Sequence, residues 1–295
     1  KKSPACNYTI VNCNKCYLIQ LKKKPKIEHL RSKDFNLRIL EPENHIDDFI
    51  KKILELGYLR KKSKILGLSY KDKSFINKIK KKGFYKSTYI SNKAYGIPSR
   101  YGVETIQNIL LKRKKLFKNK NYDLIILRHM LEHAFEPEKY IKKIKNLLSK
   151  NGLIAIELPC NKKMIKGINL HYFWEHHISY FNMETLKNFL VRMGFKILKT
   201  IVYPQSSEDN IVIIAKIGSK LKKKEKNKVN IKQKLFLKKF KSSVSTKRKK
   251  VKDYFEKLQK EKKMITLLGA GHLGIKFMNF FNINSYFNQI VDDNK

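Results

Sequence analysis

Short, almost uninterrupted apolar runs alternate with helical segments in this chain, and this alternation constrains its fold more than any other feature. The runs are YDLIILRHM (122–130), LIAIELP (153–159) and DNIVIIAKIG (209–218). Strands this apolar must be covered on both faces, and helices between them provide that cover. The pattern predicts an α/β protein with a parallel or mixed sheet.

Residues with strong conformational preferences set the expected limits of the helices. A strand is expected at 63–69, and helices are expected at 46–60, 73–84, 136–152 and 183–195. Gly83 ends the helix at 73–84. Pro137 in the first turn and Gly152 at the end bound the helix at 136–152.

Length and composition exclude several classes of protein. The chain has 295 residues, of which 42% are hydrophobic, enough for two domains with proper cores. No run of about 18 apolar residues occurs, so no membrane span is expected. Four cysteines at uneven spacing do not suggest a disulfide framework, and the cytoplasm is the expected location.

The formal net charge is +43. Such a charge normally suggests nucleic acid as a partner. Here lysine is spread along nearly the whole chain together with Ile, Asn, Phe and Tyr, the composition that an AT-rich genome tends to encode. No nucleic-acid-binding motif accompanies it, so we do not expect nucleic acid to be the partner.

The segment at 122–159 resembles class I S-adenosylmethionine (SAM)-dependent methyltransferases. In these enzymes the fourth strand is followed by an H-x-L-E-H segment, a helix that begins with Pro, and a fifth strand that ends in Pro. His129 and His133 are four residues apart, and we expect them to share a helical face at the carboxyl edge of the sheet. The alternative is that both histidines only pack the start of the helix.

The segment FWEHHISYFNMETLKNFLVRMGF (173–195) resembles the sugar C-methyltransferases that act on nucleotide-linked 4-keto-deoxyhexoses. The resemblance implies that His176 is the catalytic base, that Glu175 is its partner and that His133 lines the same pocket. Phe173 stands where the family has Tyr, at a substrate-binding position. Without this resemblance, a structural Glu–His pair among aromatic residues would explain the segment equally well.

The residues themselves suit this chemistry. A proton beside a ketone is acidic enough to be removed by a group that titrates near neutral pH, as the imidazole of His176 does. Glu175 could orient the imidazole or stabilise its cation, and the resulting enolate carbon would attack the sulfonium methyl group.

The expected donor-binding turn is GLSYKDK (67–73). Gly67 and Ser69 stand where the family has an acid and a glycine, and only Asp72 is kept. A Cβ where Gly is expected restricts the turn and the approach of a ligand to its backbone. We therefore expect an altered SAM site formed by Gly67, Ser69, Asp72 and His129.

Cys13-x-x-Cys16 is followed by an apolar strand and resembles the second half of the four-cysteine zinc module that opens these enzymes. Two thiolates two residues apart suit one tetrahedral Zn²⁺, which needs two further ligands. The spacing of Cys6 does not match, and Cys160 is expected to be a small buried residue. Ordinary thiols are the alternative.

The motif LLGAGHLG (267–274) places Gly269, Gly271 and Gly274 in a G-x-G-x-x-G pattern, and Asp292 follows an apolar strand. By itself this favours a dinucleotide site. The sugar C-methyltransferases have a similar turn in a second Rossmann-like domain, which helps to seat the sugar nucleotide. The glycines let backbone amides approach a phosphate in either case.

These observations predict a Rossmann-like class I methyltransferase sheet, preceded by part of a small zinc module and followed by the start of a second Rossmann-like unit. The expected boundaries are 1–25, 26–218, 219–263 for a basic helical connector, and 264–295. The expected function is SAM-dependent C-methylation of a nucleotide-linked keto-deoxysugar. The alternatives are a non-catalytic relative that binds a sugar nucleotide and an NAD-dependent oxidoreductase.

Overall fold

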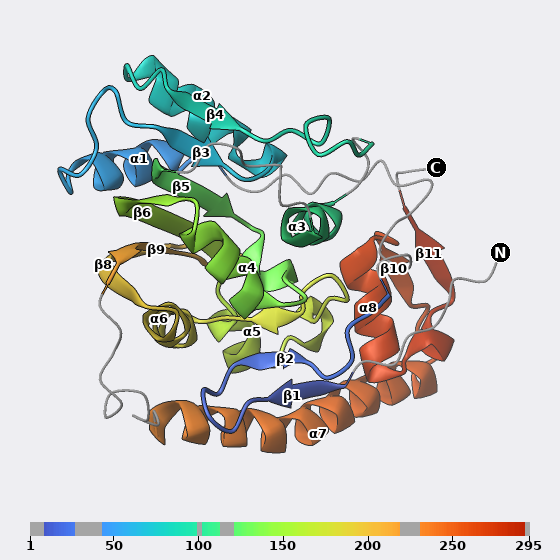
Figure 1. Ribbon diagram of the computed structural model, residues 1–295. Helices are drawn as coiled ribbons and strands as arrows, with labels where there is room; N and C mark the ends of the chain where they lie inside the picture. The colour runs from blue at the N-terminus through green and yellow to red at the C-terminus, as the bar shows by residue number, and fades with distance from the viewer. Residues whose placement is uncertain (1–8, 27–42, 99–101, 113–120, 219–230, 293–295) are drawn as a thin grey trace. The chain divides into compact units, whose positions relative to one another are not determined.

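The computed structural model describes residues 9–26, 43–98, 102–112, 121–218 and 231–292 (Figure 1). The chain divides into two compact units. The first comprises Lys1–Cys160 and Glu175–Lys228, and the second comprises Asn161–Trp174 and Val229–Lys295. Residues Asn161–Trp174, which we expected in the methyltransferase domain, thus group with the C-terminal part of the chain.

A mixed six-stranded sheet forms the centre of the first unit, in the order β4-β3-β5-β6-β9-β8 (Figure 1). The strands are β3 (Ile65–Gly67), β4 (Ser87–Tyr89), β5 (Tyr122–Arg128), β6 (Leu148–Pro159), β8 (Phe195–Tyr203) and β9 (Asn210–Ile217). Strands β4, β3, β5 and β6 run parallel, whereas β9 and β8 pair antiparallel. The predicted mixed α/β sheet is confirmed.

Helices cover both faces of this sheet. They are α1 (Ile46–Leu54), α2 (Lys73–Lys81), α3 (Val103–Lys112), α4 (Pro137–Lys145) and α6 (Met183–Arg192). Alternate side chains of β5 enter two separate cores: Leu124 and Ile126 pack with α1 and α2, while Ile125 and Leu127 pack with α3, α4 and α6. This period of two explains why the strands are apolar along their whole length.

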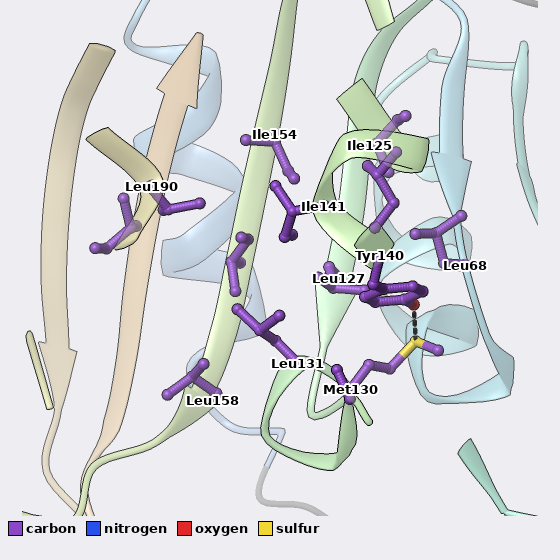
Figure 2. Packing of buried hydrophobic residues seen from close by; sticks show 14 of the residues in the cluster. Leu68, Ile125, Leu127, Met130, Leu131, Tyr140, Ile141, Ile154, Leu158 and Leu190 are labelled. Carbon is purple, nitrogen blue, oxygen red and sulfur yellow. Dashed lines mark hydrogen bonds between the residues drawn. The ribbon is translucent and has the colours of Figure 1, made fainter. Parts of the chain in front are cut away.

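The core beneath α4 fixes the segment that follows β5. Tyr140 of α4 and Met130 are fully buried, and the Tyr140 hydroxyl contacts the Met130 sulfur at 3.7 Å (Figure 2). Leu131 packs in the same cluster. Each of these side chains contributes about 1.5–3 kcal/mol through burial. The residues just after β5 are therefore held firmly at the carboxyl edge of the sheet.

Three expectations about secondary structure need correction. The helix expected at 46–60 is shorter, because α1 ends at Leu54. The predicted helix at 136–152 is too long, because α4 ends at Lys145 and β6 already begins at Leu148. Gly152 lies within β6, where a Cβ would come 2.6 Å from the Tyr122 carbonyl oxygen. We also did not predict β8. It is an edge strand with mixed burial, which weakens its apolar pattern.

A small antiparallel sheet is formed by β1 (Ile10–Asn12), β2 (Ile19–Leu21) and β7 (Ser179–Tyr180). Cys13 and Cys16 lie in the turn between β1 and β2. Strand β7 directly follows the Glu175–His177 stretch, so this sheet anchors one end of that stretch within the first unit.

The second unit contains α5 (Lys162–Gly167), α7 (Ile231–Lys260), β10 (Thr266–Leu268), α8 (His272–Phe281) and β11 (Gln289–Val291). Strands β10 and β11 are parallel. Helix α7 covers most of the predicted connector, whose residues 219–230 lie outside the described part of the chain. Among the described helices, none is long and apolar enough to cross a membrane. The described residues also form the 3₁₀ turns η2 (Tyr70–Asp72), η4 (Leu131–His133), η5 (Leu170–Tyr172) and η7 (Asn284–Tyr286).

Candidate functional site

Three of the four predicted donor-site residues lie together in the turn after β3. Ser69 caps η2, and the Asp72 carboxylate accepts hydrogen bonds from the Ser69 amide at 2.9 Å and the Arg128 amide at 3.2 Å. Asp72 thus joins the carboxyl ends of β3 and β5, the place where ligands bind in open α/β sheets. The backbone amides of Ser69 and Arg128 at this edge therefore already donate hydrogen bonds within the protein, to the Asp72 carboxylate.

Gly67 is required by close packing against Asp72. A Cβ at position 67 would lie 2.5 Å from the Asp72 Cβ, which is closer than two carbon atoms can approach. An acidic side chain at position 67 would therefore not fit beside Asp72.

We expect Gly67→Ala to lower the free energy of unfolding by about 1–3 kcal/mol, because the added methyl group overpacks the turn. Urea denaturation followed by circular dichroism measures this effect. Gly271→Ala is the control, since a Cβ there meets nothing within 4 Å, and it should cost less than about 1 kcal/mol. Equal stability of wild type and Gly67→Ala would contradict this packing argument.

A buried ion pair occupies the ends of β5 and β6. The Arg128 Nε donates to Glu157 Oε2 at 2.7 Å, and both side chains are almost fully buried. Glu157 Oε1 also contacts His45 Nε2 at 2.9 Å and His129 Nε2 at 3.1 Å. Burial tends to raise the pKa of Glu157, but the bonds from both histidines and the charge of Arg128 hold it well below its ordinary value.

His129 is placed differently from our expectation. It follows β5 in a left-handed backbone conformation with a φ of 47°, and only Leu131–His133 form a short 3₁₀ turn. His129 and His133 therefore do not share a helical face. His129 instead faces the Glu157 carboxylate.

Sequence reasoning missed Arg128, Glu157 and His45 as members of this network. A signal for two of them was present, because Arg128 and Glu157 each interrupt an otherwise apolar strand. A charged residue in a strand that is buried on both faces needs an opposite charge nearby. His45 offered no such signal, since it lies 112 residues from Glu157.

The predicted catalytic segment is held against the turn that follows β5. His133 Nδ1 lies 2.8 Å from the His176 carbonyl oxygen, and because that oxygen can only accept, Nδ1 carries the proton. The His177 ring packs edge-on against His133 with ring centroids 4.6 Å apart. Glu175 and His176 are half-buried. The structure thus brings His133 to the backbone of His176, and His177 to the His133 ring.

Phe173 lies in the second unit. It is buried near Phe240, with ring centroids 6.3 Å apart, and its carbonyl accepts a hydrogen bond from Lys276 at 2.7 Å. Its side chain packs in the interior of that unit.

Cys13 and Cys16 share a hydrogen bond across their turn. Burial opposes ionisation of the Cys13 thiol, but the amides of Cys16 and Lys15 donate to its sulfur and lower its pKa. Burial raises the pKa of Cys16. In the described residues no third side chain of a metal-binding type gathers with this pair, and Cys6 lies outside those residues. Cys160 is buried, as expected.

The glycine motif forms a strand–turn–helix in the second unit. Gly269 has a φ of 88°, Gly271 caps α8, and a Cβ on Gly274 would lie 2.8 Å from the Gly269 carbonyl oxygen. The Asp292 carboxylate accepts a hydrogen bond from the Ala270 amide. Gly271 is exposed and a Cβ there would meet nothing within 4 Å, which leaves room for a ligand at the start of α8.

Comparison with known proteins places this chain in a family. Residues 42–200, more than half of the chain, match the family model described as "Methyltransferase domain". A search of curated proteins gave no match.

Solved structures with a similar arrangement include three methyltransferases. One is a SAM-dependent methyltransferase from Methanosarcina mazei (13% identity, TM-score 0.41, 56% of this chain and 97% of that chain). Another is magnesium protoporphyrin IX methyltransferase from Synechocystis PCC 6803 (14%, 0.41, 59% and 82%). The third is 1,6-didemethyltoxoflavin-N1-methyltransferase from Burkholderia thailandensis (11%, 0.42, 72% and 100%). The family assignment rests on the family model: this chain belongs to the methyltransferase domain family, and its mixed sheet is the Rossmann-like sheet of a class I methyltransferase.

Proposed function

We propose that this protein transfers the methyl group of SAM to a carbon atom of a nucleotide-linked keto-deoxysugar, with His176 as the base. The main structural support for this proposal is the hydrogen bond of 2.8 Å from His133 Nδ1 to the His176 carbonyl oxygen. This bond holds the Glu175–His176 stretch beside the turn that follows β5. In parallel α/β sheets, that edge is where ligands bind. The resemblance of 173–195 to sugar C-methyltransferases supplies the substrate class.

In this proposal SAM binds at the carboxyl ends of β3 and β5, beside Gly67, Ser69, Asp72 and His129. SAM supplies an electrophilic methyl group when it is bound. As a separate proposal for the second unit, the start of α8 at Gly271 binds a phosphate, since backbone amides at a helix N-terminus favour an anion. Nucleotide sugars are therefore the partners that we propose.

His176→Ala should lower methyl transfer at least about hundredfold, because general-base catalysis contributes roughly 10²–10⁴-fold. The assay measures transfer of labelled methyl from SAM to a nucleotide-linked 4-keto-deoxysugar. A second readout, exchange of the proton beside the ketone with deuterium from solvent, reports the base without the methyl step. His171→Ala is the matched control, an imidazole five residues earlier that belongs to the second unit.

Calorimetric titration with SAM comes first in this experiment. One-site binding is expected, with Asp72→Ala binding more weakly than wild type. Deuterium exchange that persists in His176→Ala would contradict the assignment of the base. No binding at millimolar SAM would contradict the donor site, and would leave a non-catalytic methyltransferase fold that binds sugar nucleotides.

A further inference from the structure

Glu132, in the turn η4, is a buried carboxylate without a hydrogen bond. It is only 2% exposed, and within the described part of the chain neither oxygen has a hydrogen-bond partner. The nearest imidazole nitrogens are His129 Nδ1 at 3.7 Å and His133 Nε2 at 3.9 Å from Oε1, both beyond hydrogen-bond distance. A buried carboxylate without a hydrogen bond is costly, so this position calls for a cation.

His133 presents a lone pair toward that carboxylate. Its Nδ1–H donates to the His176 carbonyl oxygen at 2.8 Å, so in the neutral ring Nε2 is unprotonated. Nε2 is also the nitrogen nearer Glu132. A histidine held by a backbone carbonyl through one nitrogen, with the other nitrogen directed at anionic ligands, is the usual arrangement of a metal-binding imidazole.

His177 completes the group, and the backbone explains its position. The residues on either side of His177 are both tied to η4: the His176 carbonyl accepts from His133, and the Ile178 amide donates to the Glu132 carbonyl at 2.7 Å. The imidazole of His177 therefore faces the same turn, at 87° to the His133 ring. One ligand atom each from Glu132, His133 and His177 lies within 4.8 Å of the other two.

We propose that Glu132, His133 and His177 bind a divalent first-row transition metal ion such as Zn²⁺. Two imidazoles and one carboxylate are a ligand set that these ions prefer, and three protein ligands leave a position open for water or a substrate oxygen. Metal–ligand bonds of about 2.0–2.2 Å require ligand atoms roughly 3.4 Å apart in tetrahedral geometry. The three ligand atoms, now within 4.8 Å of one another, would have to move closer by up to about 1.4 Å to reach that spacing.

This site is separate from the Cys13–Cys16 pair and does not depend on the identity of the methyl acceptor. Cobalt distinguishes the two sets of ligands, because Co²⁺ bound by thiolate has a strong near-ultraviolet charge-transfer band that nitrogen and oxygen ligands do not give. The experiment titrates the purified, chelator-treated full chain with Co²⁺ in the absence of SAM and sugar nucleotide. Visible absorption and equilibrium dialysis give the ligand type and the stoichiometry.

We expect one equivalent of Co²⁺ with visible bands only, and we expect the same binding in a Cys13→Ser/Cys16→Ser variant. Glu132→Gln and His177→Gln should each weaken Co²⁺ binding at least about tenfold. Loss of an outer-shell partner already lowers metal affinity by about 10–100-fold, and loss of a ligand should lower it further. His171→Gln is the matched control and should bind as wild type does. His176→Ala should also bind normally, because the substitution keeps the backbone carbonyl that His133 binds.

Glu132→Gln also provides a test in the metal-free protein. Since it removes a buried charge without a hydrogen bond, the metal-free variant should have a Tm equal to or above that of wild type, which excludes misfolding as the cause of weak binding. Absence of Co²⁺ binding, unchanged affinity in Glu132→Gln, or Co²⁺ binding that is lost entirely in the cysteine variant would each overturn the metal site. Loss of methyl transfer with normal Co²⁺ binding would count against the proposed function alone.

Discussion

Glu157→Gln is expected to lower the free energy of unfolding by about 3–5 kcal/mol. The glutamine keeps the shape of the side chain but removes the buried charge opposite the Arg128 guanidinium, which keeps its pair with the more exposed Glu43 carboxylate at 3.4 Å. The Arg128 Nε–Glu157 bond is 2.7 Å long, and the two side chains are 1% and 0% exposed, so water cannot replace the lost partner. His45 and His129 also lose the carboxylate that binds both rings. Urea denaturation of the two proteins measures the difference.

A surface pair and a double variant serve as controls for this experiment. Glu138→Gln removes one partner of the exposed pair with Arg192 and should change the stability by less than about 1 kcal/mol. Arg128→Met/Glu157→Leu replaces both buried charges and should be more stable than Glu157→Gln. If the single variant lost less than about 1 kcal/mol, the ion pair would not be stabilising the edge of the sheet.

A pH dependence of similar size is expected from Asp72. Burial raises the pKa of its carboxyl group to about 7, despite the opposing charge of Arg128 and hydrogen bonds from the backbone of Ser69, Arg128 and Leu68. Between the ordinary pKa of 3.8 and about 7, the folded protein keeps this proton while the unfolded chain has lost it. The contribution of Asp72 to stability is therefore largest at low pH and falls as the pH rises to about 7, in total by roughly 4 kcal/mol.

The comparison of Asp72→Asn with wild type isolates this effect. The amide does not titrate, so the stability of the variant relative to wild type should rise by up to roughly 4 kcal/mol between pH 4 and pH 8. Asp47→Asn is the control. A hydrogen bond from Lys78 lowers the pKa of the exposed Asp47, so its difference from wild type should change only at more acidic pH. A difference between Asp72→Asn and wild type that is constant across this range would contradict the raised pKa.

The two cores show how much of this fold follows from local sequence. Helix α1 buries Ile46, Phe49, Ile50 and Ile53, which have the helical spacing that predicts it. Helix α2 ends where expected, next to Gly83 with a φ of 87°. The edge strand β8 and the end of α4 were not predictable in the same way. Strand pairing, rather than apolar spacing, determines where Leu148 leaves the helical region and pairs with Tyr122.

The candidate site was only partly predictable. Sequence resemblance directed attention to His133 and His176, and these two residues do meet, but through a backbone carbonyl. The ring that packs against His133 belongs to the neighbouring His177. The backbone hydrogen bonds of residues 176 and 178 orient the residue between them. Glu132 had no assigned role in the sequence, and only its burial without a hydrogen bond drew attention to it.

By itself, the sequence determined the class of fold, the family and the elements with strong periodicity, because these depend on residues that are near one another along the chain. The tertiary structure alone decided which charged groups meet. Glu157 contacts His45 over 112 residues and Arg128 over 29 residues, and Asp72 reaches the Arg128 amide over 56 residues. Such pairs form only when parallel strands end at one edge of a sheet and burial requires each charge to have an opposite charge nearby.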